Sequence, residues 1–145
     1  MFWSRAHRVP VVLSVVAALA LLLAGCGPLS AAELRREVDS IHSAAAEASV
    51  LADQIAAQRT KRTFARVQAR ELSDAAEHSA ERLTDAHPDE GLLSQTEDAI
   101  DLASQVSAAA GELETAPDDA DAAADAAERL RDLAARSQRL SESIG

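Results

Sequence analysis

The sequence predicts an all-α fold, an antiparallel up-down helical bundle built either from four helices or from one long helix packed against a helical hairpin. After residue 30, no stretch alternates apolar and polar residues for long enough to form a strand. Apolar residues recur instead at alternating steps of four and three, which is the heptad spacing of packed helices. Only three glycines and two prolines follow residue 30, so few positions can interrupt a helix.

The first 25 residues are expected to be a cleaved secretory signal that takes no part in the bundle. They hold two basic residues, Arg5 and Arg8, and no acidic residue. The apolar stretch that follows, from Val9 to Ala24, is interrupted by Pro10 and is shorter than the roughly 20 apolar residues of a membrane span. The rest of the chain holds 12 basic and 24 acidic residues, a net charge of −12. This charge pattern is typical of a signal peptide in front of a soluble domain.

The apolar stretch ends in Leu23-Ala24-Gly25-Cys26, which contains the only cysteine of the chain. This motif resembles the lipobox of bacterial lipoproteins, and the resemblance covers residues 1–26. It implies that Cys26 receives a diacylglyceryl group and that a signal peptidase, which recognises Leu23, Ala24 and Gly25, cuts before Cys26. A thiolate suits this step because it is the side-chain nucleophile best able to form a stable thioether. No other cofactor is expected, and a single cysteine excludes an internal disulfide.

The membrane is thus the first expected partner, and the expected location is the extracytoplasmic face of the cell membrane. Each buried acyl CH₂ contributes about 0.8 kcal/mol, so two acyl chains hold a protein at a bilayer almost permanently. Residues 26–30 form a short tether, and Ser30 and Glu33 have the spacing of a capping box that opens a helix. Residues 31–145 make up the bundle, which should therefore stay close to the membrane.

The first two predicted helices span residues 33–57 and 62–86. The heptad seam of the first consists of Leu34, Val38, Ile41, Ala45, Ala48, Ala52 and Ile55. Its next positions are arginines, and the apolar stripe resumes in a different frame with Ala65, Ala69, Leu72, Ala76 and Leu83. A turn near Thr60 explains the change of frame. No glycine or proline marks that turn, so one continuous helix over residues 31–86 remains the alternative.

Two breaks that contain proline define the third and fourth predicted helices, at residues 90–114 and 118–144. Pro88 disfavours helical geometry at His87 and suits the first turn of a helix. Pro117 acts in the same way, and the acidic residues after it are favoured by the helix dipole. The third segment repeats the heptad seam with Leu92, Thr96, Ala99, Ala103, Val106, Ala110 and Leu113. Four helices of about 25 residues fit a bundle about 37 Å long, which favours a turn at Thr60.

Two histidines fall inside the predicted helices, His42 and His78. A turn centred at Thr60 places them at one level of an antiparallel hairpin. Asp39 precedes His42 by three residues and Asp74 precedes His78 by four, each on the same helix face. Two carboxylates of the third helix fall at a similar height, Glu97 and Asp101. Such a cluster could bind zinc, but the E-x-x-H pairs of di-iron bundles are absent, and histidines beside a seam are commonly hydrogen-bonded to nearby acids.

A second candidate site is a run of five basic residues with no acidic residue among them, over residues 58–70. Its members are Arg59, Lys61, Arg62, Arg66 and Arg70. The four-helix topology places this run at the end far from the lipid, where it could bind an envelope protein or an acidic wall component. The alternative is a structural role, through the helix dipole and through salt bridges to Asp118, Asp119 and Asp121 at the start of the fourth helix.

The chain is not expected to be an enzyme, because no serine lies in a G-x-S-x-G turn and no other nucleophile pattern is present. The acidic segment 118–125 lacks the glycine and the bidentate glutamate of a calcium loop. The acidic excess argues against nucleic acid as a partner, and an Ala-rich core leaves little room for a small-molecule substrate.

We therefore expect a membrane-anchored extracytoplasmic lipoprotein whose bundle is a binding, scaffolding or assembly module. Two alternatives stay open. One is a divalent-metal-binding bundle that uses His42 and His78, and the other is a structural coiled-coil oligomer at the cell envelope.

Overall fold

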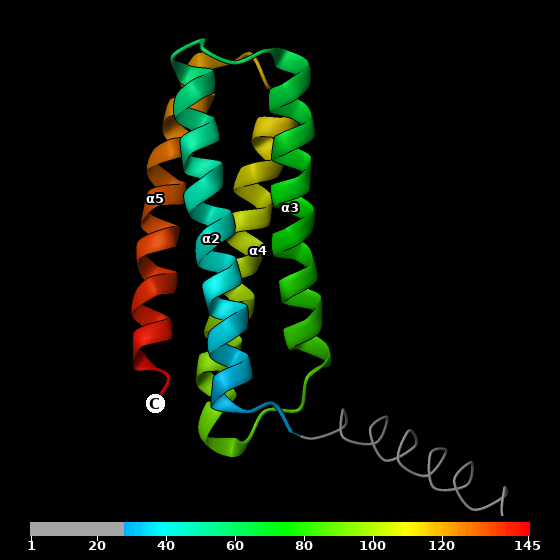
Figure 1. Ribbon diagram of the computed structural model, residues 1–145, viewed down its shortest axis with the longest axis vertical. Helices are drawn as coiled ribbons and strands as arrows, with labels where there is room; N and C mark the ends of the chain where they lie inside the picture. The colour runs from blue at the N-terminus through cyan, green and yellow to red at the C-terminus, as the bar shows by residue number, and fades with distance from the viewer. Residues whose placement is uncertain (1–27) are drawn as a thin grey trace, which may run out of the picture.

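The computed structural model describes residues 28–145 and shows an all-α, antiparallel bundle (Figure 1). Its elements are α2 (Ala31–Ala56), α3 (Arg62–Asp85), the short 3₁₀-helix η1 (Glu90–Leu92), α4 (Leu93–Thr115) and α5 (Ala120–Ser143). The predicted signal peptide, the lipobox and Cys26 lie outside the described residues. Within residues 28–145, no helix is both long and apolar enough to cross a membrane.

A capping box opens α2, as its spacing predicts. The Ser30 hydroxyl accepts from the Glu33 backbone N–H at 3.3 Å, and the Glu33 carboxylate accepts from the Ser30 backbone N–H at 2.9 Å. The Ser30 hydroxyl also donates to the Glu33 carboxylate at 2.6 Å, and this hydrogen bond, together with the one from the Ser30 backbone N–H, lowers the pKa of Glu33 from its ordinary value. The bundle therefore begins at Ser30, the third described residue.

The turn near Thr60 exists, so the long-helix alternative over residues 31–86 is wrong. The α2 helix ends in a Schellman motif, in which the Arg59 N–H donates to the Gln54 carbonyl and the Gln58 N–H to the Ile55 carbonyl, both at 2.8 Å. Gln58 occupies the left-handed position of this motif, with φ 52°. Glycine usually fills that position, and its absence is why the sequence pattern gives no direct signal for the turn.

Replacing Gln58 with glycine should stabilise the protein. A left-handed conformation costs a non-glycine residue roughly 1–2 kcal/mol, part of which is offset by the larger entropy of glycine in the unfolded chain. We expect Gln58→Gly to raise the free energy of unfolding by about 0.5–1 kcal/mol in urea denaturation. The control, Ala75→Gly on the exposed face of α3, should lower it by about 1 kcal/mol. A loss of stability in Gln58→Gly would contradict the assigned turn geometry.

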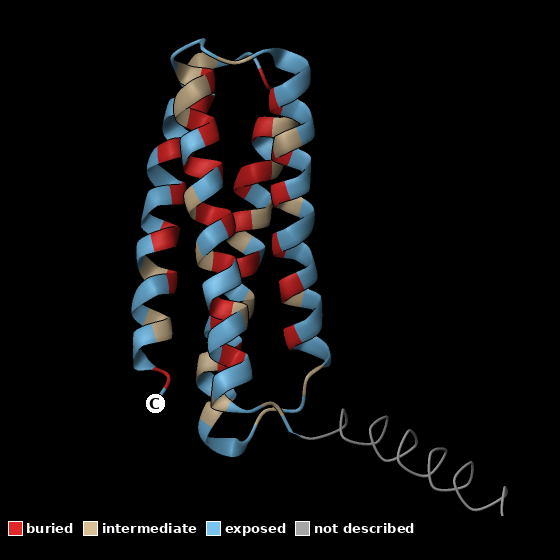
Figure 2. Cartoon of the chain, viewed as in Figure 1, coloured by how far each residue is buried: buried red, intermediate tan, exposed pale blue. Residues whose placement is uncertain are grey.

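The predicted seams form the core (Figure 2). All seven seam residues of α2 are at most 3% exposed, and the five stripe residues of α3 are at most 6% exposed. In the third seam only Leu92 is partly exposed. These heptad positions face the interior of the bundle, with Leu92 at its edge, so the packing of a single chain is enough to account for the heptad pattern.

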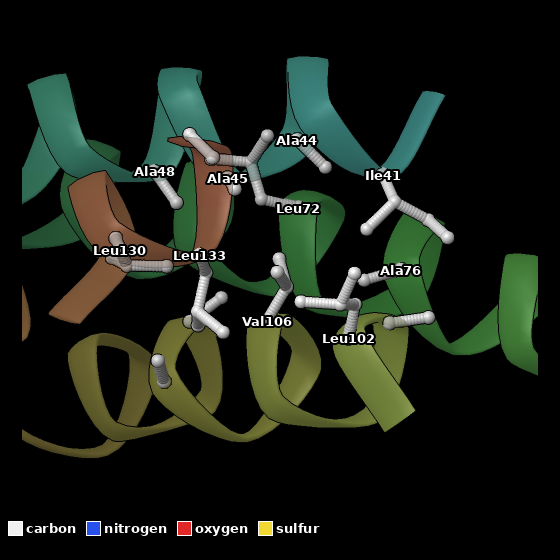
Figure 3. Close-up of a cluster of buried hydrophobic side chains, with 14 of the residues drawn as sticks. Ile41, Ala44, Ala45, Ala48, Leu72, Ala76, Leu102, Val106, Leu130 and Leu133 are labelled. Carbon is white, nitrogen blue, oxygen red and sulfur yellow. The ribbon is translucent and has the colours of Figure 1, made fainter. Parts of the chain in front are cut away.

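Alanine sets the spacing of the helices. Of the 28 buried apolar residues in the described part of the chain, 15 are alanine and none is aromatic. The most extensive packing joins α2 to α5 and α3 to α4, while the α2–α3 and α4–α5 contacts are less extensive. Figure 3 shows larger side chains, among them Leu72, Val106 and Leu133, filling the space between these close pairs. The bundle thus consists of two closely packed helix pairs, α2–α5 and α3–α4, with Leu, Ile and Val side chains between them.

Ion pairs between helices lie around this core. Arg82 on α3 pairs with Glu37 on α2 at 2.7 Å, and Arg131 on α5 pairs with Asp53 on α2 at 2.6 Å. The Arg129 guanidinium on α5 donates to both carboxylate oxygens of Glu112 on α4, with 3.1 Å from Nη1 to Oε1. Each pair joins neighbouring helices at the surface. Exposed pairs add little stability, so their main effect is on how the two helices align along their lengths.

The Arg129–Glu112 pair predicts a specific dependence on pH. Hydrogen bonding to Arg129 lowers the pKa of Glu112 below its ordinary value of 4.5. Its stabilisation is therefore complete above that value and is lost as the pH falls through the lowered pKa. We expect Arg129→Gln to cost less than about 1 kcal/mol at neutral pH, with the difference from wild type shrinking in acid. Arg139→Gln is the control, since Arg139 makes no ion pair within residues 28–145. A difference that grows on acidification would contradict this prediction.

Candidate functional site

The five predicted basic residues form one surface, which we call the basic end. Arg59 and Lys61 lie in the α2–α3 turn, and Arg62, Arg66 and Arg70 follow at steps of four along α3. All five are exposed. In Figure 1 the α2–α3 and α4–α5 turns share the upper end of the bundle. The first described residues, the α3–α4 loop and the C-terminus lie at the lower end, so the topology expected from the sequence is confirmed.

Ion pairing accounts for only part of the basic end. Arg62 lies 3.6 Å from Asp118, and both side chains are 63% exposed. Arg70 lies 3.9 Å from Asp74, one turn along the same helix. Within residues 28–145 the other three basic residues, Arg59, Lys61 and Arg66, have no ion-pair partner.

Of the three predicted acidic partners, only Asp118 forms the expected salt bridge. Asp119 has a different role, because its side chain accepts from the Ala122 N–H at 3.0 Å and caps α5. Asp121 lies in the first turn of α5 and makes no ion pair within the described chain. The predicted salt bridges are therefore confirmed for a single pair, which is exposed and contributes little stability.

Helix dipoles also fail to explain the basic end. The N-terminus of a helix carries a partial positive charge, so cations in the first turn are unfavourable there. The N-cap of α3 is Lys61, which makes no side-chain capping hydrogen bond, and its first turn contains no acidic residue. By contrast, α2 and α5 begin with Glu33 and Asp121 in their first turns. Only Arg59, just after the C-terminus of α2, complements a dipole.

Two exposed apolar side chains lie on the same helix as Arg62, Arg66 and Arg70. Phe64 is 54% exposed and Val67 is 52% exposed, and Phe64 is the only aromatic residue of the described chain. Their spacing of three places them on one side of α3, while the spacing of four places Arg62, Arg66 and Arg70 on another. The site predicted from the sequence does not include these two residues. The signal was present, because both fall outside the stripe that contains Ala65 and Ala69.

No protein-family model, curated protein or solved structure matches this chain. The basic end has three cations without an ion-pair partner in the described residues, and α3 also carries two exposed apolar side chains.

The histidines do not form the predicted cluster. His42 is half-buried and its Nδ1 lies 2.9 Å from the Ala134 carbonyl oxygen of α5. His78 is exposed, and its Nδ1 lies 3.1 Å from Glu81 Oε2 on its own helix. Each ring therefore has a partner other than the aspartate that the sequence pattern suggested.

Three of the four carboxylates proposed for that cluster have other partners. Asp39 accepts from the Ser141 hydroxyl at 2.6 Å, Asp74 pairs with Arg70, and Asp101 accepts from the Gln105 amide at 2.6 Å. Over residues 28–145, no group of three or more His, Cys, Asp or Glu side chains has the geometry to hold a metal ion. His42 and His78 are thus reached by different partners, and no observation favours the metal-binding alternative.

Proposed function

We propose that this protein is a lipid-anchored protein of the cell envelope whose helical bundle is a binding module. A diacylglyceryl group on Cys26 would hold it at the extracytoplasmic face of the membrane. The basic end would be directed away from the lipid, toward an acidic envelope protein. The lipobox supports the anchor, and the basic end supports the binding role.

The observation that carries the binding role is the position of the three cations without ion partners. Arg59 and Lys61 lie in the α2–α3 turn and Arg66 lies in the second turn of α3, in a chain that is otherwise strongly acidic. Lys61 is the N-cap of α3, the end of a helix at which a cation is unfavourable. The like charges and the opposed dipole at Lys61 do not favour the stability of the bundle. A ligand of opposite charge removes that repulsion on binding and is steered toward the surface from a distance.

The exposed apolar side chains favour a protein over an acidic wall polymer. Phe64 and Val67 are each about half exposed on α3, the helix that also carries Arg66. Interfaces between proteins are enriched in aromatic residues and arginine. Moving apolar groups out of water into such an interface lowers the free energy of binding. A polyanion with no apolar surface would use the cations and leave Phe64 in water.

The anchor is tested by Cys26→Ala. We expect the wild-type chain to incorporate labelled fatty acid and to fractionate with membranes, and the variant to lose the label completely and to be misprocessed or released. Mass spectrometry of the mature protein should show an acylated Cys26 as the first residue. Fatty-acid label that persists in the Cys26→Ala chain, or a mature wild-type chain without acyl groups on Cys26, would overturn the lipid anchor.

The binding role is tested by chemical cross-linking in intact cells. The variant Arg59→Gln/Arg66→Gln removes two cations from the basic end, and the control Arg36→Gln/Arg139→Gln removes two exposed cations elsewhere. We expect a cross-linked species that is lost in the first double variant, reduced by Phe64→Ser and retained in the control. Equal cross-linking in both double variants would contradict a partner site at the basic end.

A further inference from the structure

We infer that the lower end of the bundle, formed by the α3–α4 loop and Leu93, rests against the lipid headgroups and sets the orientation of the protein on the membrane. The inference builds on the proposed lipid anchor at Cys26. It adds a contact surface and an occupant, which is the surface of the bilayer that holds the anchor.

The chain is fixed to this loop close to its first described residue. The Leu29 N–H donates to the His87 carbonyl at 2.8 Å, and Leu29 forms an isolated parallel bridge with Pro88. The Leu29 side chain is partly buried against the core, and Ser30 immediately caps α2. A tether that ends at Leu29 therefore joins the bundle at the α3–α4 loop.

The length of the tether limits how far this loop can lie from the lipid. Three residue steps separate Cys26 from Leu29. Even a fully extended chain spans at most about 11 Å over that interval. The headgroup layer on each side of a bilayer is itself about 5–8 Å thick. This reach exceeds the thickness of the headgroup layer by only about 3–6 Å, so a diacylglyceryl group on Cys26 would keep the α3–α4 loop within a few ångströms of the headgroups.

The side chains at this end fit a shallow contact. Leu93, the first residue of α4, is 49% exposed, and Leu92 beside it is partly exposed. This apolar surface leaves water when it meets the boundary between headgroups and acyl chains. The exposed carboxylates of Asp89 and Glu90 lie in the same loop, and burying a charge in hydrocarbon is costly. They limit the contact to headgroup depth.

The orientation can be tested with matched fluorescent labels. Acylation blocks the thiol of Cys26, so Leu93→Cys or Phe64→Cys each supplies one reactive thiol at a position that is about half exposed, 49% or 54%. The full lipidated chain is placed in phosphatidylcholine vesicles that contain a lipid with a headgroup-attached quencher. We expect the label at position 93 to be quenched several-fold more strongly than the label at position 64.

Each other outcome has a distinct meaning. Equal quenching at the two positions, or stronger quenching at position 64, would show a bundle that lies on its side or meets the lipid with its basic end, and would overturn the inference. Mass spectrometry of the same samples separates the two proposals. A chain without acyl groups on Cys26 would contradict the proposed lipid anchor itself. An acylated chain whose label at position 93 is not quenched would contradict only the inferred orientation. Thermal melts of both labelled chains confirm that each is folded.

Discussion

Leu130→Ala is expected to lower the free energy of unfolding by about 2–5 kcal/mol. Leu130 is fully buried on α5 and is one of 13 buried Leu, Ile and Val side chains in a core that contains 15 alanines in the described residues (Figure 3). Its removal takes away the transfer free energy of the lost methyl groups and leaves a cavity. Alanine neighbours have no side-chain atoms that can move in to fill it. Urea denaturation followed by circular dichroism measures the loss.

The control for this variant is Leu93→Ala, which makes the same chemical change at a half-exposed position. We expect it to shift the free energy of unfolding by no more than about 0.5 kcal/mol in solution. Similar losses in the two variants would mean that Leu130 does not pack as the structure places it.

Ala48→Leu is expected to have the second largest effect, a loss of about 1–3 kcal/mol or more. Ala48 has no exposed surface and lies in the seam of α2, the helix that packs most extensively on α5. Three additional carbon atoms at this position must either push the two helices apart or force neighbouring side chains out of their preferred rotamers.

The matched control is Ala124→Leu, which adds the same side chain on the exposed face of α5. Leucine and alanine both favour helix, so this variant should stay within about 0.5 kcal/mol of wild type. Thermal melts distinguish the two outcomes directly. An Ala48→Leu protein as stable as its control would show that the helices are not in close contact there.

The sequence predicted the fold well because the heptad seams are simple and uninterrupted. Every seam residue from Leu34 to Ile55 is buried, and the shift of frame between Ile55 and Ala65 marks the turn between α2 and α3. The turn could not be read directly, because Gln58 adopts a conformation that depends on the surrounding hydrogen bonds rather than on residue type. The 3₁₀ turn over Glu90–Leu92 likewise needed the structure, since it replaces the first turn of the predicted third helix.

The candidate site was only partly predictable. The basic run could be counted, and its position at the end away from residue 28 follows from the topology. Which cations pair with acids depends on side-chain geometry. A salt bridge was predicted for Asp119, but its side chain is the N-cap of α5. The histidine cluster failed for a similar reason. Two residues at one level of a hairpin can face different helices, and His42 reaches α5 while His78 stays on the surface of α3.

The distribution of charge along the bundle has a consequence for crowding on the membrane. Residues 58–70 carry five basic and no acidic residues, and the rest of the described chain carries seven basic and 24 acidic residues. The molecule is therefore an electric dipole along its long axis. Copies held by the same end would stand with their dipoles parallel, and parallel dipoles side by side repel over roughly the Debye length of about 8 Å. With the proposed lipid anchor, this repulsion would oppose the clustering of bundles on the membrane.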